Sequence, residues 1–227
     1  MDETSKYIMG KEIDLLINYP KTKRDPLKRA QEKTEHDREI ARKFEKDFFD
    51  GERKHGYGGF SYNSRFWQPV IPTFKNYWNL DSSSSVLDVG CAKGFMLYDF
   101  YKLNPNLDLH GIDISKYAID HSVPKIKHKL QVANATKLPY DDNFFDLVIA
   151  INTIHNLDKD ECGIALKEIS RVSKKNAFVT VDAFNNEDEK KRMYAWNLTA
   201  KTIMSIENWK KFFSDKKYNG DYFWFIP

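Results

Sequence analysis

The pattern of apolar and polar residues changes at about residue 85. From there to residue 184, five short apolar runs rich in β-branched residues alternate with segments of helical periodicity. The runs are VLDVG, DLHGID, LQVANA, DLVIAIN and FVTVDA. Strands that alternate with helices are typical of an α/β fold with a parallel sheet. We therefore expect a Rossmann-like, doubly wound, mostly parallel sheet within residues 85–227.

The residues after this region are less regular. NEDEKKRMYAWNLTAKT and ENWKKFF have the composition of helices, and DYFWFIP has that of a terminal strand. Because only this one additional strand is convincing, the sheet is predicted to have six strands. A seventh, short strand would have to lie in KKYNGD.

Residues 1–55 form a charged N-terminal extension with two predicted helices. KEIDLLINY predicts a short helix that Pro20 ends. A longer helix follows, with Thr34-x-x-Asp37 as its cap. This helix carries an apolar stripe at four-residue spacing, formed by Ile40, Phe44 and Phe48. The stripe must pack against another surface, and a second copy of the chain in a homodimer is one candidate.

Residues 56–84 form the segment that connects the extension to the sheet. Its first part, in HGYGGFSYNSRFWQPV, has no clean period and predicts an ordered loop. Such a loop could close over the open end of the sheet as a lid and exclude water from a reaction. Alternatively, its aromatic side chains fasten the N-terminal helices to the sheet domain. The lid interpretation predicts substrate contacts for Tyr57, Tyr62, Arg65 and Trp67.

The run VLDVGCAKG, residues 86–94, predicts a buried strand and a glycine-bracketed turn that opens into a helix. Nucleotide-binding βαβ units begin in this way. The dinucleotide pattern G-x-G-x-x-G, placed on Gly90, would need glycines where the chain has Ala92 and Phe95. Asp88 would also repel a phosphate. The pattern therefore argues against a dinucleotide and favours a ligand with an ammonium group.

S-adenosylmethionine is such a ligand, since it has an amino acid tail, a sulfonium, a ribose and an adenine but no phosphate. The next predicted strand supports this choice. It ends at Asp113, nineteen residues after Gly94, close to the roughly 20-residue offset at which an acidic residue binds ribose hydroxyls. An aspartate at a strand end is by itself equally well explained as a turn residue. The turn and the spacing together predict S-adenosylmethionine as the cofactor.

The region from about Ser85 to Ala183 resembles the class I S-adenosylmethionine-dependent methyltransferases, of the type 11 small-molecule group. The motifs that carry the resemblance are VLDVGCAKG, GIDIS, VANATKLPYDDNFFDLVIAINTIHN and ALKEISRVSKKNAFVTVDAF. The resemblance implies that the first acidic residue and the glycine turn hold the methionine moiety. These positions are Asp88, Gly90, Cys91, Ala92 and Gly94.

The resemblance also implies the contacts to the nucleoside part of the cofactor. Asp113 would bind the ribose, and Ile114 would pack on the adenine. Asn134 stands where the family usually has aspartate, but its side chain can still accept a hydrogen bond from the adenine amine. The backbone N–H of Ala135 would donate to the ring. Ala92, where the family more often has glycine, is the other departure.

Methyl transfer requires alignment of the two partners and removal of a proton. The acceptor should lie at the carboxyl ends of the fourth and fifth strands. His155 follows the fourth strand and is the candidate general base, unless its ring only bonds a neighbouring backbone group. Asp182 could orient this histidine, bind the acceptor or cap a turn. Asn152 is a further candidate for a cofactor contact, and Asn156, Tyr194 and Asn197 are candidates for acceptor contacts, although the asparagines at 152 and 156 could instead stabilise turns.

Composition limits the remaining possibilities. The 227 residues carry a net charge of +3, which is too small to indicate nucleic-acid binding. Two cysteines and no apolar run near 18 residues favour a cytoplasmic chain without a disulfide framework or a membrane span. The basic run KTKRDPLKR, 21–29, could meet a phosphorylated acceptor but is more typical of a solvated surface. We expect no metal site.

The sequence therefore predicts an enzyme that methylates an oxygen or nitrogen of a small polar metabolite, with a sugar or nucleotide sugar as the favoured class. Two alternatives remain open. A protein or RNA methyltransferase would show a wide binding groove. A non-catalytic S-adenosylmethionine-binding scaffold would bind the cofactor without turnover and would leave the apolar stripe of the N-terminal helix exposed.

Overall fold

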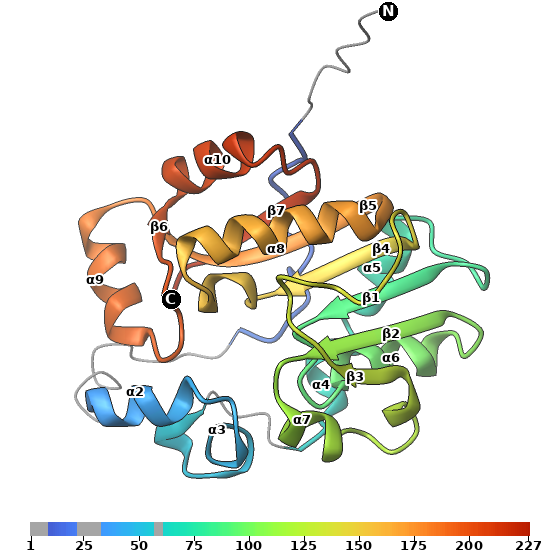
Figure 1. Ribbon diagram of the computed structural model, residues 1–227, viewed down its shortest axis with the longest axis horizontal. Coiled ribbons are helices and arrows are strands. Elements are labelled where there is room, and N and C mark those ends of the chain that lie inside the picture. The colour runs from blue at the N-terminus through green and yellow to red at the C-terminus, as the bar shows by residue number, and fades with distance from the viewer. Residues whose placement is uncertain (1–8, 22–32, 57–60) are drawn as a thin grey trace, which may run out of the picture.

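A seven-stranded sheet forms the centre of the computed structural model, which describes residues 9–21, 33–56 and 61–227 (Figure 1). The strand order is β3-β2-β1-β4-β5-β6, and β7 also pairs with β5. All pairings between these strands are parallel. This confirms the predicted doubly wound sheet, whose strands are β1 Ser85–Val89, β2 Asp108–Asp113, β3 Leu130–Val132, β4 Phe145–Ile151, β5 Ser173–Phe184, β6 Met204–Ser205 and β7 Asp221–Phe225.

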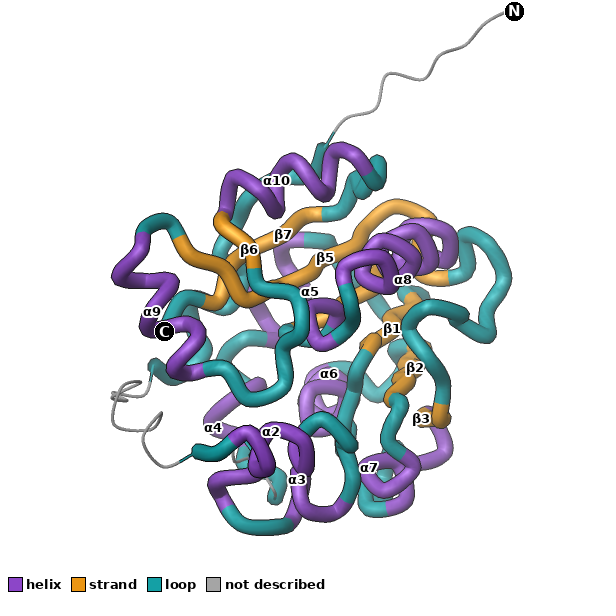
Figure 2. The backbone as a smooth tube through the Cα atoms, turned by 60° about the vertical axis from the view of Figure 1, so that its left-hand side comes forward, coloured by secondary structure: helices purple, strands orange, loops and turns teal. Residues whose placement is uncertain are grey.

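Helices cover both faces of the sheet (Figures 1 and 2). Helices α8 (Lys159–Val172) and α10 (Ile206–Asp215) pack on one face, and α5 (Ile71–Tyr77) and α6 (Phe95–Leu103) pack on the other. Neighbouring strand residues point to opposite faces, so the central strands β1, β2, β4 and β5 contribute to both cores. Two separate hydrophobic clusters result. Among the described residues, no helix has the length and apolarity that a bilayer crossing requires.

The C-terminal part differs from the prediction in two places. The predicted helix up to residue 202 ends early, because α9 covers only Glu187–Trp196 and the Asn197 side chain then closes a turn with the backbone of Ala200. The seventh strand does not lie in KKYNGD, where Lys217 has a left-handed backbone conformation. It is instead β6, two residues that pair with the end of β5.

The segment 9–21 forms no helix, so the short helix predicted there is wrong. Glu12 forms a parallel bridge with Tyr222 of β7. The N–H of Ile13 donates to the carbonyl of Tyr222, whose own N–H donates to the carbonyl of Lys11. This pairing covers the free edge of β7, and an uncovered edge would be open to association with other strands.

The longer predicted helix is divided in two. Helix α2 (Glu35–Ala41) begins with the predicted capping box, in which Thr34 and Asp37 bond reciprocally. Helix α3 (Lys46–Asp50) follows after Phe44, whose φ of 52° cannot continue a helix. The stripe residues are half-buried, and the rings of Phe44 and Phe48 pack edge to face.

Contacts fix α2 to the rest of the chain. Asp37 accepts hydrogen bonds from Thr34 and is 3.0 Å from His55 Nε2 in the 3₁₀-helix η1 (Arg53–His55). The Thr34 hydrogen bonds hold the pKa of Asp37 well below its ordinary value. The buried Lys33 donates to the Trp196 carbonyl at the end of α9. Helix α2 therefore lies beside the C-terminal part of the chain (Figure 1).

Candidate functional site

The glycine loop between β1 and α6 has the backbone conformation that its sequence requires. Gly90 and Gly94 have φ angles of 83° and 77°, in the left-handed region where a Cβ is unfavourable. The N–H groups of Gly90 and Cys91 donate to the Ile112 carbonyl of β2. A Cβ at Gly90 would lie 2.5 Å from Thr153 Cγ2 and closer still to Thr153 Oγ1. The loop therefore packs directly against the residues that follow β4.

Ala92 adopts the left-handed conformation that the family usually assigns to glycine, with a φ of 50°. Its N–H donates to Asp113 Oδ2 at 2.8 Å. The other carboxylate oxygen of Asp113 accepts from the N–H of Ser115, also at 2.8 Å. Asp113 thus holds the loop in a conformation that an alanine would otherwise disfavour.

Two buried carboxylates lie at this loop. Asp88 is 4% exposed, and its carboxyl group receives no hydrogen bond from the described part of the chain. Burial, and secondly the charge of Asp113, raise the pKa of Asp88 to about 8. Burial also raises the pKa of Asp113, although its two backbone hydrogen bonds oppose this. A cation at Asp88 would offset the desolvation, so the loop fits the ammonium and sulfonium groups of S-adenosylmethionine.

The raised pKa of Asp88 predicts that cofactor affinity depends on pH. In the unfolded chain the Asp88 carboxyl has a pKa near 3.8, whereas in the folded chain its pKa is about 8. As the pH rises from about 4 to about 8, Asp88 therefore contributes less to the stability of the folded chain. A bound cation lowers this pKa and expels the proton. We therefore expect S-adenosylmethionine affinity to rise from about pH 6 to about pH 7.5, by up to about tenfold per unit, below the range where an α-amino group deprotonates.

Calorimetric titration at a series of pH values measures this change, and buffers of different ionisation enthalpy count the released protons. The control is Asp88→Asn, which should bind more weakly and without the pH dependence. Equal affinity of the unmodified chain at both ends of the range would contradict the assignment.

The residues predicted to hold the nucleoside lie at the carboxyl ends of β2 and β3. Ile114 is 56% exposed, so its side chain is accessible to a ligand beside the two buried carboxylates. Asn134 is exposed, and its Oδ1 accepts from both the N–H and the hydroxyl of Thr136. Ala135 follows it and is half-buried. Because β2 and β3 are neighbouring parallel strands, the four positions 113, 114, 134 and 135 lie at the same edge of the sheet.

His155 and Asp182 lie together at the ends of β4 and β5. His155 belongs to the 3₁₀-helix η3 (Ile154–Asn156) and is 4% exposed. Its Nδ1 accepts a hydrogen bond from the Asp182 N–H at 2.9 Å, so the neutral ring carries its proton on Nε2, 3.8 Å from Asp182 Oδ2. Burial lowers the pKa of His155, against the effect of Asp182. These contacts favour the backbone-bonding alternative for His155.

Asn152 and Asn156 also make local contacts. Asn152 has a φ of 50°, and its Oδ1 accepts from the Thr180 hydroxyl of β5. Asn156 donates from Nδ2 to the Asn152 carbonyl, while its Oδ1 is buried without a donor among the described residues. Both side chains thus shape the turn after β4, and Asn156 retains one free acceptor.

The residues predicted to form a lid pack mainly on α6 and on the N-terminal segment. Tyr62 donates to Asp99 of α6 at 2.6 Å, and Lys102 donates to the Tyr62 hydroxyl. Trp67 lies in helix α4 (Ser64–Trp67), which forms within the predicted loop. The centroid of its ring is 5.0 Å from that of the Tyr19 ring. Arg65 is exposed over Phe66, and Tyr57 is outside the described residues. These contacts favour the fastening alternative.

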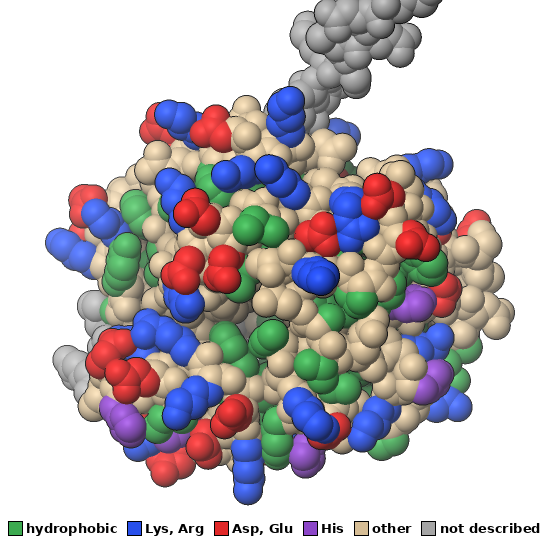
Figure 3. Space-filling view, in the orientation of Figure 1, with side chains coloured by type: hydrophobic (Ala, Val, Ile, Leu, Met, Phe, Trp, Pro, Cys, Tyr) green, Lys and Arg blue, Asp and Glu red, His purple; other side chains and the backbone are tan. Residues whose placement is uncertain are grey.

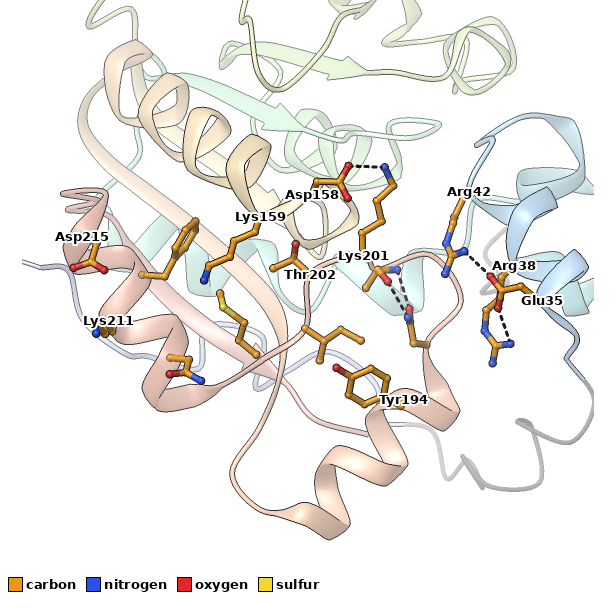
Figure 4. A pocket seen from close by; sticks show the side chains of 16 residues that line it. Glu35, Arg38, Arg42, Asp158, Lys159, Tyr194, Lys201, Thr202, Lys211 and Asp215 are labelled. Atoms are coloured by element: carbon orange, nitrogen blue, oxygen red, sulfur yellow. Dashed lines mark hydrogen bonds and ion pairs between the residues drawn. The ribbon is translucent and has the colours of Figure 1, made fainter.

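A polar groove of about 1090 Å³ lies between α2, the start of α8, and the chain from α9 to α10 (Figure 4). Tyr194 and Asn197, both predicted as acceptor contacts, line this groove. The N–H groups of Lys201 and Thr202 in its wall donate to the His155 carbonyl. Thr153, two residues before His155, touches the glycine loop. The groove and the cofactor loop therefore adjoin the same turn after β4.

The groove contains charged residues that the sequence did not single out. They are Glu35, Arg38, Arg42, Asp158, Lys159, Lys201, Lys211 and Asp215. Three of them lie between residues 35 and 42, and the other five lie between residues 158 and 215, more than a hundred positions later. No local motif connects the two groups, which come together where α2 packs beside the C-terminal part of the chain.

The chain belongs to the methyltransferase domain family, whose model matches residues 80–217. This match, the sheet and the buried acidic loop together define a class I domain whose cofactor is S-adenosylmethionine.

Two curated relatives show how widely this domain is used. The chain is 35% identical over 112 residues to a tRNA (carboxymethyluridine(34)-5-O)-methyltransferase of Arabidopsis thaliana, covering 49% of this chain and 26% of that protein. It is 38% identical over 93 residues to phosphoethanolamine N-methyltransferase 3 of the same plant, covering 38% of this chain and 19% of that protein. The chain thus spans about a quarter or less of these relatives.

A solved structure shows the same fold. Geranyl diphosphate C-methyltransferase of Streptomyces coelicolor A3(2), in a complex that includes S-adenosyl-L-homocysteine, matches with a TM-score of 0.51. The identity is 12%, over 65% of this chain and 61% of that chain. At this identity the likeness concerns the fold alone.

Proposed function

We propose that this chain transfers a methyl group from S-adenosylmethionine to an oxygen or nitrogen of a small polar metabolite. Sugars and nucleotide sugars are the first acceptor class to test. The observation that carries the proposal is that the polar groove adjoins the turn of Thr153 and His155, which also contacts the glycine loop. An acceptor in the groove would thereby come close to a cofactor at Asp88.

S-adenosylmethionine supplies an electrophilic methyl group on a sulfonium. In the proposed site, Asp88 offsets the positive charge of the methionine part, and Gly90 to Gly94 leave room for it. Asp113 accepts from the ribose hydroxyls, while Ile114 and the backbone of Ala135 contact the adenine. Residues of the groove align the acceptor, and alignment accounts for most of the catalysis in such a displacement. Candidates for this alignment are Tyr194 and Asn197, which line the groove, and Asn156, which lies in the adjoining turn after β4 and has an Oδ1 that is unpaired among the described residues.

For His155 we propose a positioning role, in which its contacts with Asp182, Lys201 and Thr202 hold the turn beside the groove. His155→Asn retains an acceptor for the Asp182 N–H, whereas His155→Ala removes it. We expect the Asn variant to keep the methylation rate within about tenfold of the unmodified chain, and the Ala variant to lose more. Loss of 10²- to 10⁴-fold in both variants would instead identify a general base. Initial rates with an acceptor found in the screen below measure the difference.

The screen that tests the proposed function uses S-adenosylmethionine labelled on the methyl group, with pools of sugars, nucleotide sugars, amino acid derivatives and phosphorylated metabolites. Transfer of label to one pool, and its absence with Asp113→Ala, would support the proposal. Binding of the cofactor without transfer to any pool would favour the non-catalytic scaffold.

RNA methylation is the second candidate, because one relative acts on tRNA by its printed name. The basic side chains of the groove are compatible with this substrate. Total tRNA added to the screen distinguishes the two candidates, since an RNA enzyme would label tRNA and none of the small-molecule pools.

We also propose a cytoplasmic location, since Cys91 and Cys162 are both unpaired thiols. A homodimer through the N-terminal helices stays a prediction. Its proposed contact surface, the stripe that includes Ile40, Phe44 and Phe48, is half-buried within one chain. Sedimentation of the purified chain at several concentrations would measure the association.

A further inference from the structure

One end of the polar groove presents three cations from two separate parts of the chain. Arg38 lies on α2 and Arg42 lies one turn later at its C-cap, while Lys201 lies in the segment between α9 and β6 (Figure 4). We propose that this end of the groove binds the phosphate of a phosphorylated small-molecule acceptor through Arg38, Arg42 and Lys201. The inference deepens the proposed function and rests on it, because it takes the groove as the acceptor site.

The carboxylates that now pair with these cations are easily replaced. Arg42 Nη1 is 2.8 Å and Arg38 Nη1 3.6 Å from the Glu35 carboxylate, whose side chain is 64% exposed. Lys201 Nζ is 3.1 Å from Asp158, which is 68% exposed. The cations are less exposed, at 20% for Arg38, 31% for Arg42 and 44% for Lys201. Solvated ion pairs of this kind are weak, so a ligand anion can displace the carboxylates.

Arg42 also has a donor that its present partner does not satisfy. Its Nε is buried and has no acceptor among the described residues. An unsatisfied buried donor is unfavourable. A phosphate has three terminal oxygens, one more than the Glu35 carboxylate, and the planar guanidinium fork suits phosphate geometry. A phosphate in place of Glu35 would therefore accept hydrogen bonds from both Arg38 and Arg42. It would also have an oxygen available to accept from Arg42 Nε.

The dimensions and surroundings of the groove favour a small molecule over RNA. Its volume of about 1090 Å³ is close to the upper end of the range for small-molecule sites, about 300–1,000 Å³. An RNA surface would need a continuous basic track with several stacking aromatics. Basic and acidic side chains are instead interspersed on this face (Figure 3). Tyr194, 52% exposed in the groove, offers one ring against which a sugar or base could pack.

The test is calorimetric titration of the full chain with sodium phosphate, at constant ionic strength maintained with chloride. We expect Arg42→Gln to weaken phosphate binding about tenfold, and Arg42→Lys to weaken it less, because lysine keeps the charge but not the fork. Glu35→Gln should strengthen binding severalfold, since it removes the competing carboxylate. Lys46→Gln, an exposed position of α3 outside the groove, is the charge-matched control and should have no effect.

Opposite effects of Arg42→Gln and Glu35→Gln, with an unchanged control, would support the inference. It is overturned if phosphate does not bind, if all variants bind equally, or if tRNA alone binds in an Arg42-dependent manner. Titration of the unmodified chain and of each variant with S-adenosylmethionine distinguishes failure of the proposed phosphate site from failure of the proposed function. Intact cofactor binding without phosphate binding would remove only the anion site, whereas loss of cofactor binding in the unmodified chain would remove the methyltransferase assignment.

Discussion

Asp113→Ala is expected to lower the affinity for S-adenosylmethionine about 100-fold. The variant would lack the hydrogen bonds that we propose between the Asp113 carboxylate and the ribose hydroxyls, and a hydrogen bond to a charged group contributes about 1.5–3 kcal/mol. The substitution also removes the acceptor that holds Ala92 in its left-handed conformation, with N–H to Oδ2 at 2.8 Å. Together these losses amount to about 3 kcal/mol, and each 1.4 kcal/mol is a factor of ten in affinity.

Calorimetric titration of the purified variant measures this effect. Asp108→Ala is the matched control, because Asp108 lies at the other end of the same strand, is exposed, and its carboxylate forms an ion pair with His110. Asp113→Asn keeps the shape without the charge and should fall between the two. Equal affinities of the Asp108 and Asp113 variants would refute the role of Asp113.

Gly90→Ala is expected to destabilise the chain by about 3 kcal/mol. The new Cβ would lie 2.5 Å from Thr153 Cγ2, in a backbone conformation with φ of 83°. Left-handed strain contributes about 1–2 kcal/mol and overpacking about 1–3 kcal/mol. For a chain of this size, the melting temperature should fall by about 10 °C.

Thermal unfolding followed by circular dichroism checks this value. In the double variant with Thr153→Ala, part of the loss should be recovered, because the Oγ1 and Cγ2 contacts are removed while the backbone strain stays. The control is Gly163→Ala within α8, where the atoms nearest to the new Cβ belong to the flexible end of Lys216. That variant should be neutral or slightly more stable. A Gly90 variant as stable as the Gly163 variant would show that the loop is not packed against Thr153.

The sequence predicted the central sheet because its signals are local. Each buried strand reads as a continuous apolar run, and the helix predicted to follow the glycine turn is α6. The Thr34 capping box could be predicted equally well, since its two partners are three residues apart. The cofactor residues could be named because they lie in short motifs at strand ends. In this part of the site, residues that are close together in the sequence are also close together in space.

The failures of prediction have a common physical cause in tertiary contacts. The spacing of Ile40, Phe44 and Phe48 continues a helical period across the break at Phe44, so periodicity alone could not reveal it. Residues 11–19 have helical character, but pairing of Lys11 to Ile13 with Tyr222 places this segment at the sheet edge.

The groove was missed for the same reason. Arg42 lies on a helix that sequence reasoning treated as part of an extension, and Lys201 lies in a segment predicted as helix. A salt-bridge pattern between Glu35, Arg38 and Arg42 is visible in the sequence, but it is equally typical of a solvated helix face. The buried hydrogen bond from Lys33 to the Trp196 carbonyl, next to this helix, helps to place these charges at the site.

Calorimetric titration of the full chain with S-adenosylmethionine and S-adenosylhomocysteine, with NAD in parallel, tests the central claim most directly. The structure predicts binding of one molecule of either sulfur ligand per chain, and no binding of NAD, because Ala92 and Phe95 stand where a pyrophosphate-binding loop has glycine. Binding of NAD, or failure of a well-folded chain to bind either sulfur ligand, would contradict the assignment of the glycine loop and its two buried carboxylates.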